Sequence, residues 1–191
     1  MKKALIILMM TVITFFTVCA QGTGTGNKQT GGNMKILVAY FSHTGTTAAV
    51  AKHIQSLTGG TLFEIKTVNP YPSDYNACLA QATEELRANS RPPLSTHVSD
   101  IDSYEIIFIG YPIWWGDSPM AIRTFLEEYD LSNKTIIPFC TSGSSGINTS
   151  IQSIKKLCPK SKILEGICIT NANRNRTKEM IEQWINKLDI K

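Results

Sequence analysis

Short apolar runs alternate with longer stretches of helical periodicity from Met34 to the end of the chain. The runs are rich in Ile, Val and Phe, and turns containing polar residues or glycine bound them. Helices that cover a parallel sheet on both faces leave its strands with such continuous apolar patterns. We therefore predict five parallel strands, at Lys35–Phe41, Thr61–Lys66, Glu105–Ile109, Thr135–Cys140 and Lys162–Ile169.

Apolar residues at helical spacing separate these runs. Gly59 and Gly60 end the first helix. The apolar faces of the successive helices are Val50/Ile54/Leu57, Tyr75/Cys78/Leu79/Ala82/Leu86, Ile122/Phe125/Leu126/Tyr129, Ile147/Ile151/Ile154/Leu157 and Ile181/Trp184/Ile185/Leu188. We expect the second helix to cover the sheet. Pro138 cannot donate a ladder hydrogen bond, so we expect it near the end of its strand or at a bulge. The predicted fold class is α/β, a doubly wound five-stranded sheet with helices on both faces.

The first 20 residues have the outline of a secretory signal peptide, because Lys2 and Lys3 precede an uncharged, largely apolar run over residues 4–18. The run is shorter than the roughly 20 residues that a membrane span needs, so an anchor helix is the weaker interpretation. Residues 21–33 are rich in Gly, Thr, Asn and Gln and indicate a flexible linker. Residues 34–191 then form one domain.

Two kinds of processing stay open at the end of the signal peptide. Val18 and Ala20 form a small-residue site for cleavage before Gln21, which we favour. Cys19 could instead become a lipid-modified N-terminal residue that tethers the protein to a membrane. In either case we expect an exported protein, in the periplasm or at the cell envelope.

Charge and cysteine spacing exclude several kinds of ligand. The net charge is +4, but three of the lysines precede Met34, so the domain is nearly neutral. It has no basic stripe with interleaved aromatic residues, which argues against nucleic acid as a partner. Cys78, Cys140, Cys158 and Cys168 lack C-x-x-C spacing, which argues against a metal site. Their apolar surroundings predict that Cys140 and Cys168 are buried thiols.

A hydroxyl-rich turn follows the first predicted strand and opens directly onto a helix. Its residues are Ser42, His43, Thr44, Gly45, Thr46 and Thr47. The N–H groups at a helix start, together with hydroxyl donors and a glycine that lets the backbone come close, suit a phosphate group. The lysine of a nucleoside-triphosphate loop is absent, which argues against ATP or GTP. The alternative is a capped helix that begins with a polar turn.

Two adjacent tryptophans follow the third predicted strand. The run contains Tyr111, Pro112, Ile113, Trp114, Trp115, Gly116 and Asp117. Large flat side chains beside a phosphate site suit a planar heteroaromatic ligand. Adjacent side chains point in different directions, so we expect one tryptophan to stack on the ligand. The alternative is that both cover the edge of the sheet.

A small, polar loop follows the fourth predicted strand. Its residues are Thr141, Ser142, Gly143, Ser144, Ser145 and Gly146. The loop could bring backbone donors to the edge of a ring, and it lacks the Gly-x-Ser-x-Gly spacing of a nucleophile elbow. The alternative is a glycine-rich turn before a helix.

Together these loops resemble those of the flavodoxin family, and the resemblance spans Met34 to Leu188. Ser42–Thr47 fits the family's phosphate loop of Ser or Thr, any residue, Thr, Gly, any residue, Thr. Tyr111–Gly116 resembles the isoalloxazine loop of a branch with a tryptophan pair. The resemblance implies the strand order 2-1-3-4-5, with one FMN bound non-covalently where the strand order reverses.

The resemblance also implies roles for the loops. Ser42 and Thr44–Thr47 would hold the FMN phosphate, with His43 contributing mainly its backbone. Pro112–Gly116 would flank the flavin ring, and Thr141–Gly146 would cover its other side. A further hypothesis is that the Gly116 carbonyl responds to changes at flavin N5.

The function implied by the resemblance is electron transfer through FMN, with a redox protein or a small electron acceptor as partner. We favour an electron carrier. Typical flavodoxins are strongly acidic and dock their partners by that charge, whereas this domain is nearly neutral, so its partners can differ from those of the family. The loop after the fourth predicted strand has no Tyr or Trp to close the second face of the flavin, and an open face could admit a substrate. An FMN-dependent reductase of quinones or other small acceptors is therefore the first alternative. A non-redox ligand-binding module on the same fold is the second.

Overall fold

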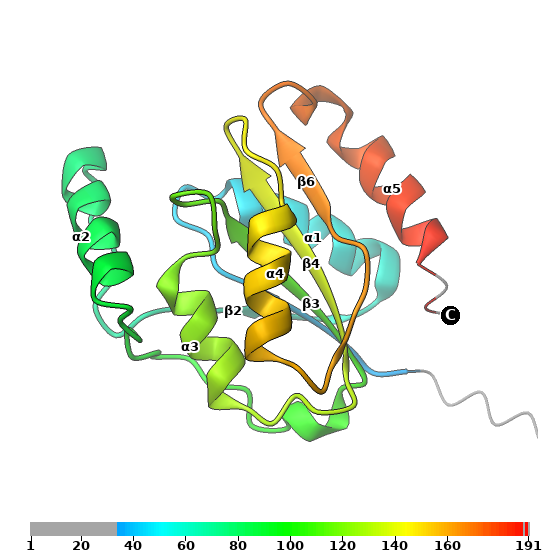
Figure 1. Cartoon of the computed structure of the whole chain (residues 1–191). Helices are drawn as coiled ribbons and strands as arrows, with labels where there is room; N and C mark the ends of the chain where they lie inside the picture. Colours follow the sequence, from blue (N-terminus) through cyan, green and yellow to red (C-terminus); the bar gives the residue numbers. More distant parts are fainter. Residues whose placement is uncertain (1–33, 189, 191) are drawn as a thin grey trace, which may run out of the picture. The chain divides into compact units, whose positions relative to one another are not determined.

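The computed structural model describes residues 34–188 and 190 (Figure 1). Its strands are β1 Ile36–Tyr40, β2 Thr61–Glu64, β3 Ile106–Pro112, β4 Thr135–Ser142, β5 Lys162–Ile163 and β6 Ile167–Thr170. Its α-helices are α1 Thr46–Thr58, α2 Tyr75–Arg87, α3 Met120–Glu128, α4 Asn148–Leu157 and α5 Thr177–Lys187, with short 3-10 helices at Ile101–Ser103 and Arg174–Arg176. The strands pair in parallel in the order β2-β1-β3-β4-β5, and β6 also pairs with β4. The predicted order is confirmed.

Alternate residues of each strand enter two separate cores, as the pleat of a strand requires. In β1, Leu37 and Ala39 belong to the core under α3 and α4, whereas Val38 and Tyr40 belong to the core under α1 and α5. Both faces of the sheet are therefore buried, which explains the continuous apolar runs in the sequence. Helices α1 and α5 contact each other on one face, and α3 and α4 contact each other on the other.

The fifth strand is split, in contrast to the single strand predicted over Lys162–Ile169. β5 and β6 both pair with β4, but residues 164–166 between them do not continue the ladder. The Ile136 carbonyl accepts a hydrogen bond from the Leu164 N–H at 3.0 Å, so Pro138, two residues later, faces the same neighbour without an N–H. Pro138 thus lies inside β4 rather than at its end, and the interruption falls on the neighbouring strand.

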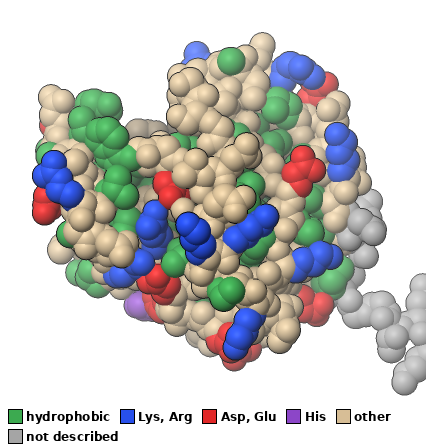
Figure 2. All heavy atoms as spheres, viewed as in Figure 1, with side chains coloured by type: hydrophobic (Ala, Val, Ile, Leu, Met, Phe, Trp, Pro, Cys, Tyr) green, Lys and Arg blue, Asp and Glu red, His purple; other side chains and the backbone are tan. Residues whose placement is uncertain are grey.

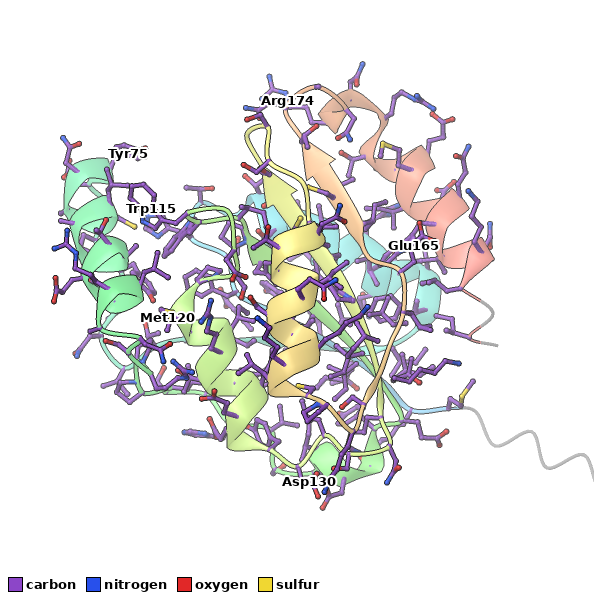
Figure 3. All side chains as sticks on the ribbon, in the orientation of Figure 1. Tyr75, Trp115, Met120, Asp130, Glu165 and Arg174 are labelled. Atoms are coloured by element: carbon purple, nitrogen blue, oxygen red, sulfur yellow. The ribbon has the colours of Figure 1, made fainter. Side chains whose placement is uncertain are left out.

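Two contacts define the path of the chain in the break between β5 and β6. The carbonyl of Glu165, labelled in Figure 3, accepts a hydrogen bond from the Trp184 indole N–H at 3.0 Å, so this carbonyl in the break still has a partner. A Cβ at Gly166 would lie 2.7 Å from the Pro138 carbonyl oxygen. Glycine is therefore required where the chain passes Pro138.

Helix α2 does not cover the sheet, contrary to the prediction. Only Cys78 and Ala82 of this helix are buried, and Tyr75 is 74% exposed. Among the helices it contacts α3, and Figure 1 shows it standing beside the rest of the domain. The predicted helix is confirmed at Tyr75–Arg87, but its apolar face does not lie on the sheet.

The predicted signal peptide and linker, residues 1–33, lie outside the described residues. Within the part that is described, no helix has the length and apolar character to cross a membrane. Cleavage before Gln21, lipidation of Cys19 and export stay predictions from the sequence.

Candidate functional site

The turn after β1 leads into the N-terminus of α1. Gly45 is the N-cap residue at φ 86°, a conformation that favours glycine, and it has no side chain to cap the helix. The Ser42 hydroxyl accepts a hydrogen bond from the Ala48 N–H at 3.2 Å. Thr44 and Thr46 are exposed, and their hydroxyls lie 3.3 Å apart. The turn therefore presents hydroxyls and the positive end of the helix dipole to the same space.

A buried hydroxyl pair joins this turn to β4. The Thr47 and Thr141 hydroxyl oxygens are 2.8 Å apart, and both side chains are buried. One hydroxyl donates to the other, and the accepting hydroxyl keeps its own O–H group, so the pair both joins the two segments and retains a donor. This pair sets the position of the turn after β1 relative to the end of β4.

The tryptophan run after β3 forms a tight two-residue turn. The Trp114 N–H donates to the Asp117 carbonyl at 2.9 Å, and the Asp117 N–H donates to the Trp114 carbonyl at 3.0 Å. Trp115 at φ 52° and Gly116 at φ 79° occupy the centre, and positive φ at both residues defines a type I′ turn. A bulky residue in this region costs roughly 1–2 kcal/mol, so Trp115 is held in a strained conformation.

Side chains from two helices hold this turn in place. The Asp117 carboxylate accepts hydrogen bonds from Arg123 of α3 at 2.9 Å and from Ser153 of α4 at 2.6 Å. It also accepts one from the Ser118 N–H at 2.7 Å. The Arg123 and Asp117 side chains are only 18% and 13% exposed, so the ion pair is largely shielded from water.

The two tryptophans have different environments. Trp114 packs edge-on against Phe41, Tyr71 and His43, with ring centroids at 5.5, 4.9 and 5.9 Å. Trp115 is 55% exposed at the tip of the turn. This is consistent with the expectation that the two side chains point in different directions. Trp114 is partly buried against the core, and Trp115 is the more exposed of the two rings.

A cavity of about 620 Å³ opens where these loops meet. Eleven of the predicted site residues line it: His43, Thr44, Thr46, Thr47, Pro112, Ile113, Trp114, Trp115, Thr141, Ser142 and Gly143. The other predicted residues, Ser42, Gly45, Gly116, Ser144 and Gly146, belong to the same loops but do not line the cavity. The structure thus brings all three predicted loops to one edge of the sheet, at the carboxyl ends of its strands.

Two groups of lining residues were missed in the sequence. One group is Ile169, Thr170, Asn171 and Arg174, which follow or end β6; the other is Tyr75, Cys78, Leu79 and Ala82 of α2. The group at the end of β6 could have been predicted from the sequence, because a fifth parallel strand ends at the same edge of the sheet as the others. The Asn171 N–H donates to the Gly143 carbonyl at 3.3 Å and joins this loop to the one after β4.

The lining of the cavity favours an anionic ligand with an apolar part. None of the lining residues is Asp or Glu, and Arg174 brings a positive charge. The described residues contain no cluster of His, Cys, Asp or Glu that could hold a metal ion. Trp115, Leu79 and Ile113 are among the apolar residues that line the cavity.

A pair of thiols lies on β4 and β6, one residue before the lining residues Thr141 and Ile169. Cys140 and Cys168 are partners in the parallel register. Cys140 is buried as predicted, whereas Cys168 is only partly buried, contrary to the prediction. The hydrogen bond between them, with burial as the second cause, raises the pKa of Cys140, and the same bond lowers the pKa of Cys168. Cys168 is therefore the more readily ionised thiol of the pair.

Comparisons with known proteins agree with this geometry. A family model described as Flavodoxin matches residues 35–188. The crystal structure of a candidate flavoprotein from Bacteroides eggerthii is 39% identical, with a TM-score of 0.73 over 82% of this chain and 99% of that one. A similar candidate flavoprotein from Bacteroides uniformis is 37% identical, with a TM-score of 0.73 over 81% and 99% of the two chains.

More distant structures share the fold. A flavoprotein from Lactobacillus acidophilus, solved in complex with FMN, is 21% identical with a TM-score of 0.64 over 75% of this chain and 97% of that one. A comparison with curated proteins gives no significant match. These results identify the family and the fold, and the chemistry must be argued from the cavity.

Proposed function

The chain belongs to the flavodoxin family, and from this membership and the cavity we propose that it binds one FMN non-covalently and passes electrons through it. FMN supplies a ring that accepts and releases electrons. The single observation that carries the proposal is the placement of the α1 N-terminus, whose N-cap residue Gly45 has no side chain, and an exposed aromatic turn in one cavity.

The cavity suits FMN in size and in chemistry. Its volume of about 620 Å³ lies within the range of roughly 300–1,000 Å³ that small-molecule pockets have. Thr44 and Thr46 at the start of α1 would hold the phosphate by hydroxyl and backbone N–H groups. Trp115 and Ile113 would contact the ring. No carboxylate lines the cavity to repel the phosphate.

The protein's part in the chemistry is to bind and orient the ring and to exclude water from one of its sides. The Arg123–Asp117 contact holds the type I′ turn, so the backbone of Trp115 is in place before a ligand binds. This lowers the entropic cost of ordering the site on binding. His43 packs against Trp114 and supports the turn, so we assign it a structural role. No side chain needs to act as an acid or a base.

We propose further that the protein works outside the cytosol, in the periplasm or cell envelope. The support is the apolar N-terminal run after Lys2 and Lys3. An electron-transfer protein or a small electron acceptor would then be its partner. Fractionation of the producing cells, followed by N-terminal sequencing, tests both export and the choice between cleavage before Gln21 and lipidation of Cys19.

Reduction of a small acceptor is the second candidate function. It is favoured by the nearly neutral charge of the domain, and on the face shown in Figure 2 basic and acidic side chains are interspersed. Sustained oxidation of a nicotinamide donor in the presence of a quinone would support the reductase. Electron exchange with proteins alone would support the carrier.

The primary experiment is to purify the full chain and record its visible absorption before and after adding FMN. The account predicts flavin bands that stay with the protein through gel filtration. A folded protein that remains colourless after incubation with FMN would contradict the proposed function.

A further inference from the structure

Helix α2 presents apolar side chains that no other helix covers. Tyr75 is 74% exposed, and Leu79 is partly exposed one turn later. Figure 2 shows hydrophobic side chains over this helix beside a hollow in the surface. Both residues also line the large cavity, so their exposed surface is available to a ligand bound there.

The C-terminal half of α2 is attached to the tryptophan run. The Tyr71 hydroxyl donates to the Glu85 carboxylate at 2.5 Å, and the Tyr71 ring packs on Trp114 at 4.9 Å. A second, small cavity lies between α2 and the two tryptophans, with Ala82 and Leu86 on the helix side. The helix therefore lies next to the turn that carries Trp115.

The N-terminal half of α2 lines the large cavity. Tyr75, Cys78, Leu79 and Ala82 line it together with Trp115 and with the threonines at the start of α1. Figure 3 labels Tyr75 on α2 and Trp115 on the loop after β3. The section of the cavity near α2 is therefore walled by apolar and aromatic groups.

We propose that α2 is a binding wall for the isoalloxazine ring of FMN, with Tyr75 and Leu79 contacting the ring. The inference rests on the proposed function. The loop after β4 contains no aromatic residue that could stack on a flavin, so the ring has no aromatic partner on that side. An aromatic and a branched apolar side chain on α2, next to the Trp115 turn, add to the surface that the ring can contact.

This arrangement separates the contacts of the phosphate from those of the ring. Thr44 and Thr46 contact only the phosphate, so riboflavin, which lacks it, does not use them. Tyr75 and Leu79 contact the ring, which FMN and riboflavin share. Substitutions on α2 therefore weaken both ligands by the same factor, and substitutions in the phosphate turn weaken FMN alone.

The test uses the full chain and measures the dissociation constants of FMN and riboflavin by flavin fluorescence. The variants are Tyr75→Ala, Tyr75→Phe and Leu79→Ala. Leu57→Ala is the matched control, because Leu57 is 41% exposed on α1 and does not line the cavity. We expect Tyr75→Ala and Leu79→Ala each to weaken both flavins roughly threefold to tenfold. Tyr75→Phe and Leu57→Ala should leave both constants within about twofold.

The two possible failures are distinguishable. If the wild-type protein binds flavin but Tyr75→Ala and Leu79→Ala bind both ligands like wild type, the α2 wall is wrong and the proposed function stands. If the folded wild-type protein binds neither flavin, the proposed function and the wall both fail. Thermal unfolding of each variant confirms folding, which the exposure of Tyr75 favours.

Discussion

The loops after β1, β3 and β4 form one wall of the cavity, which we call the loop wall, and helix α2 forms another, the α2 wall. The two walls are held in place by different contacts. The loops are joined across the sheet by the buried Thr47–Thr141 pair, and the tryptophan turn is fixed by the Asp117–Arg123 ion pair. Helix α2 buries two residues and is attached mainly through Tyr71 and Glu85. We infer that the loop wall is held in place without a ligand, and we expect the α2 wall to gain packing when a ligand binds.

The largest expected effect comes from breaking the phosphate end of the loop wall. Hydrogen bonds to a charged group contribute about 1.5–3 kcal/mol each. The double variant Thr44→Ala/Thr46→Ala should therefore weaken FMN roughly 100-fold or more by titration, if both hydroxyls bind the phosphate. Riboflavin serves as the control ligand, and an equal loss for riboflavin would contradict a phosphate role.

The next effect concerns the rigidity of the loop wall. Arg123→Met leaves the Asp117 carboxylate largely buried with its cationic partner removed, which should cost about 3 kcal/mol of unfolding free energy. Arg87→Met is the control, because Arg87 is 77% exposed beside Glu84 and should change stability by less than about 0.5 kcal/mol. Urea unfolding measures both. Equal stabilities for the two variants would show that the ion pair does not hold the turn.

A smaller effect tests the strain at the tip of the turn. Trp115→Gly removes a bulky residue from φ 52°, and we expect the unfolding free energy to rise by about 1 kcal/mol. The same variant should bind FMN more weakly, because the exposed ring is lost. A variant that is less stable than wild type would argue that Trp115 contributes packing rather than strain.

The smallest expected effect is a difference in alkylation rate between two thiols, Cys78 on α2 and Cys168 on β6. Cys168 has a lowered pKa and is partly exposed. It should therefore react first with iodoacetamide when the pH is below about 8.5, the ordinary pKa of a thiol. Burial, followed by the nearby Glu85 carboxylate, raises the pKa of Cys78, and burial raises that of Cys158 to about 11. Both should react slowly.

Only Cys78 lines the cavity, on α2, among the described cysteines. FMN should therefore slow its alkylation further and leave the rate at Cys168 unchanged. Peptide mass spectrometry after timed labelling gives both rates. Protection of Cys168 but not of Cys78 would contradict contact between the ligand and α2.

The fold could be predicted from the sequence because its signals are local. Helical and strand periodicities differ, and parallel strands buried on both faces leave continuous apolar runs. The break in the fifth strand could not be read in the same way. It depends on Pro138 facing residues 164–166 across the sheet, which is a tertiary relation.

The candidate site was predicted where it follows strand ends and missed where it depends on the position of a helix. The turns after β1, β3 and β4 follow from the rule that open parallel sheets bind ligands at the carboxyl edge. The apolar face of α2 has the same spacing whether it covers a sheet or lines a cavity, so the sequence could not distinguish the two. The left-handed conformation of Trp115 was also hidden, because tryptophan has no preference for it.

The most direct test of the central claim is isothermal titration of the purified full chain with FMN and, separately, with riboflavin. We expect saturable 1:1 binding of FMN and weaker binding of riboflavin, since riboflavin lacks the phosphate that contacts the start of α1. No saturable binding of FMN to the folded protein would contradict the claim that this cavity is a flavin site.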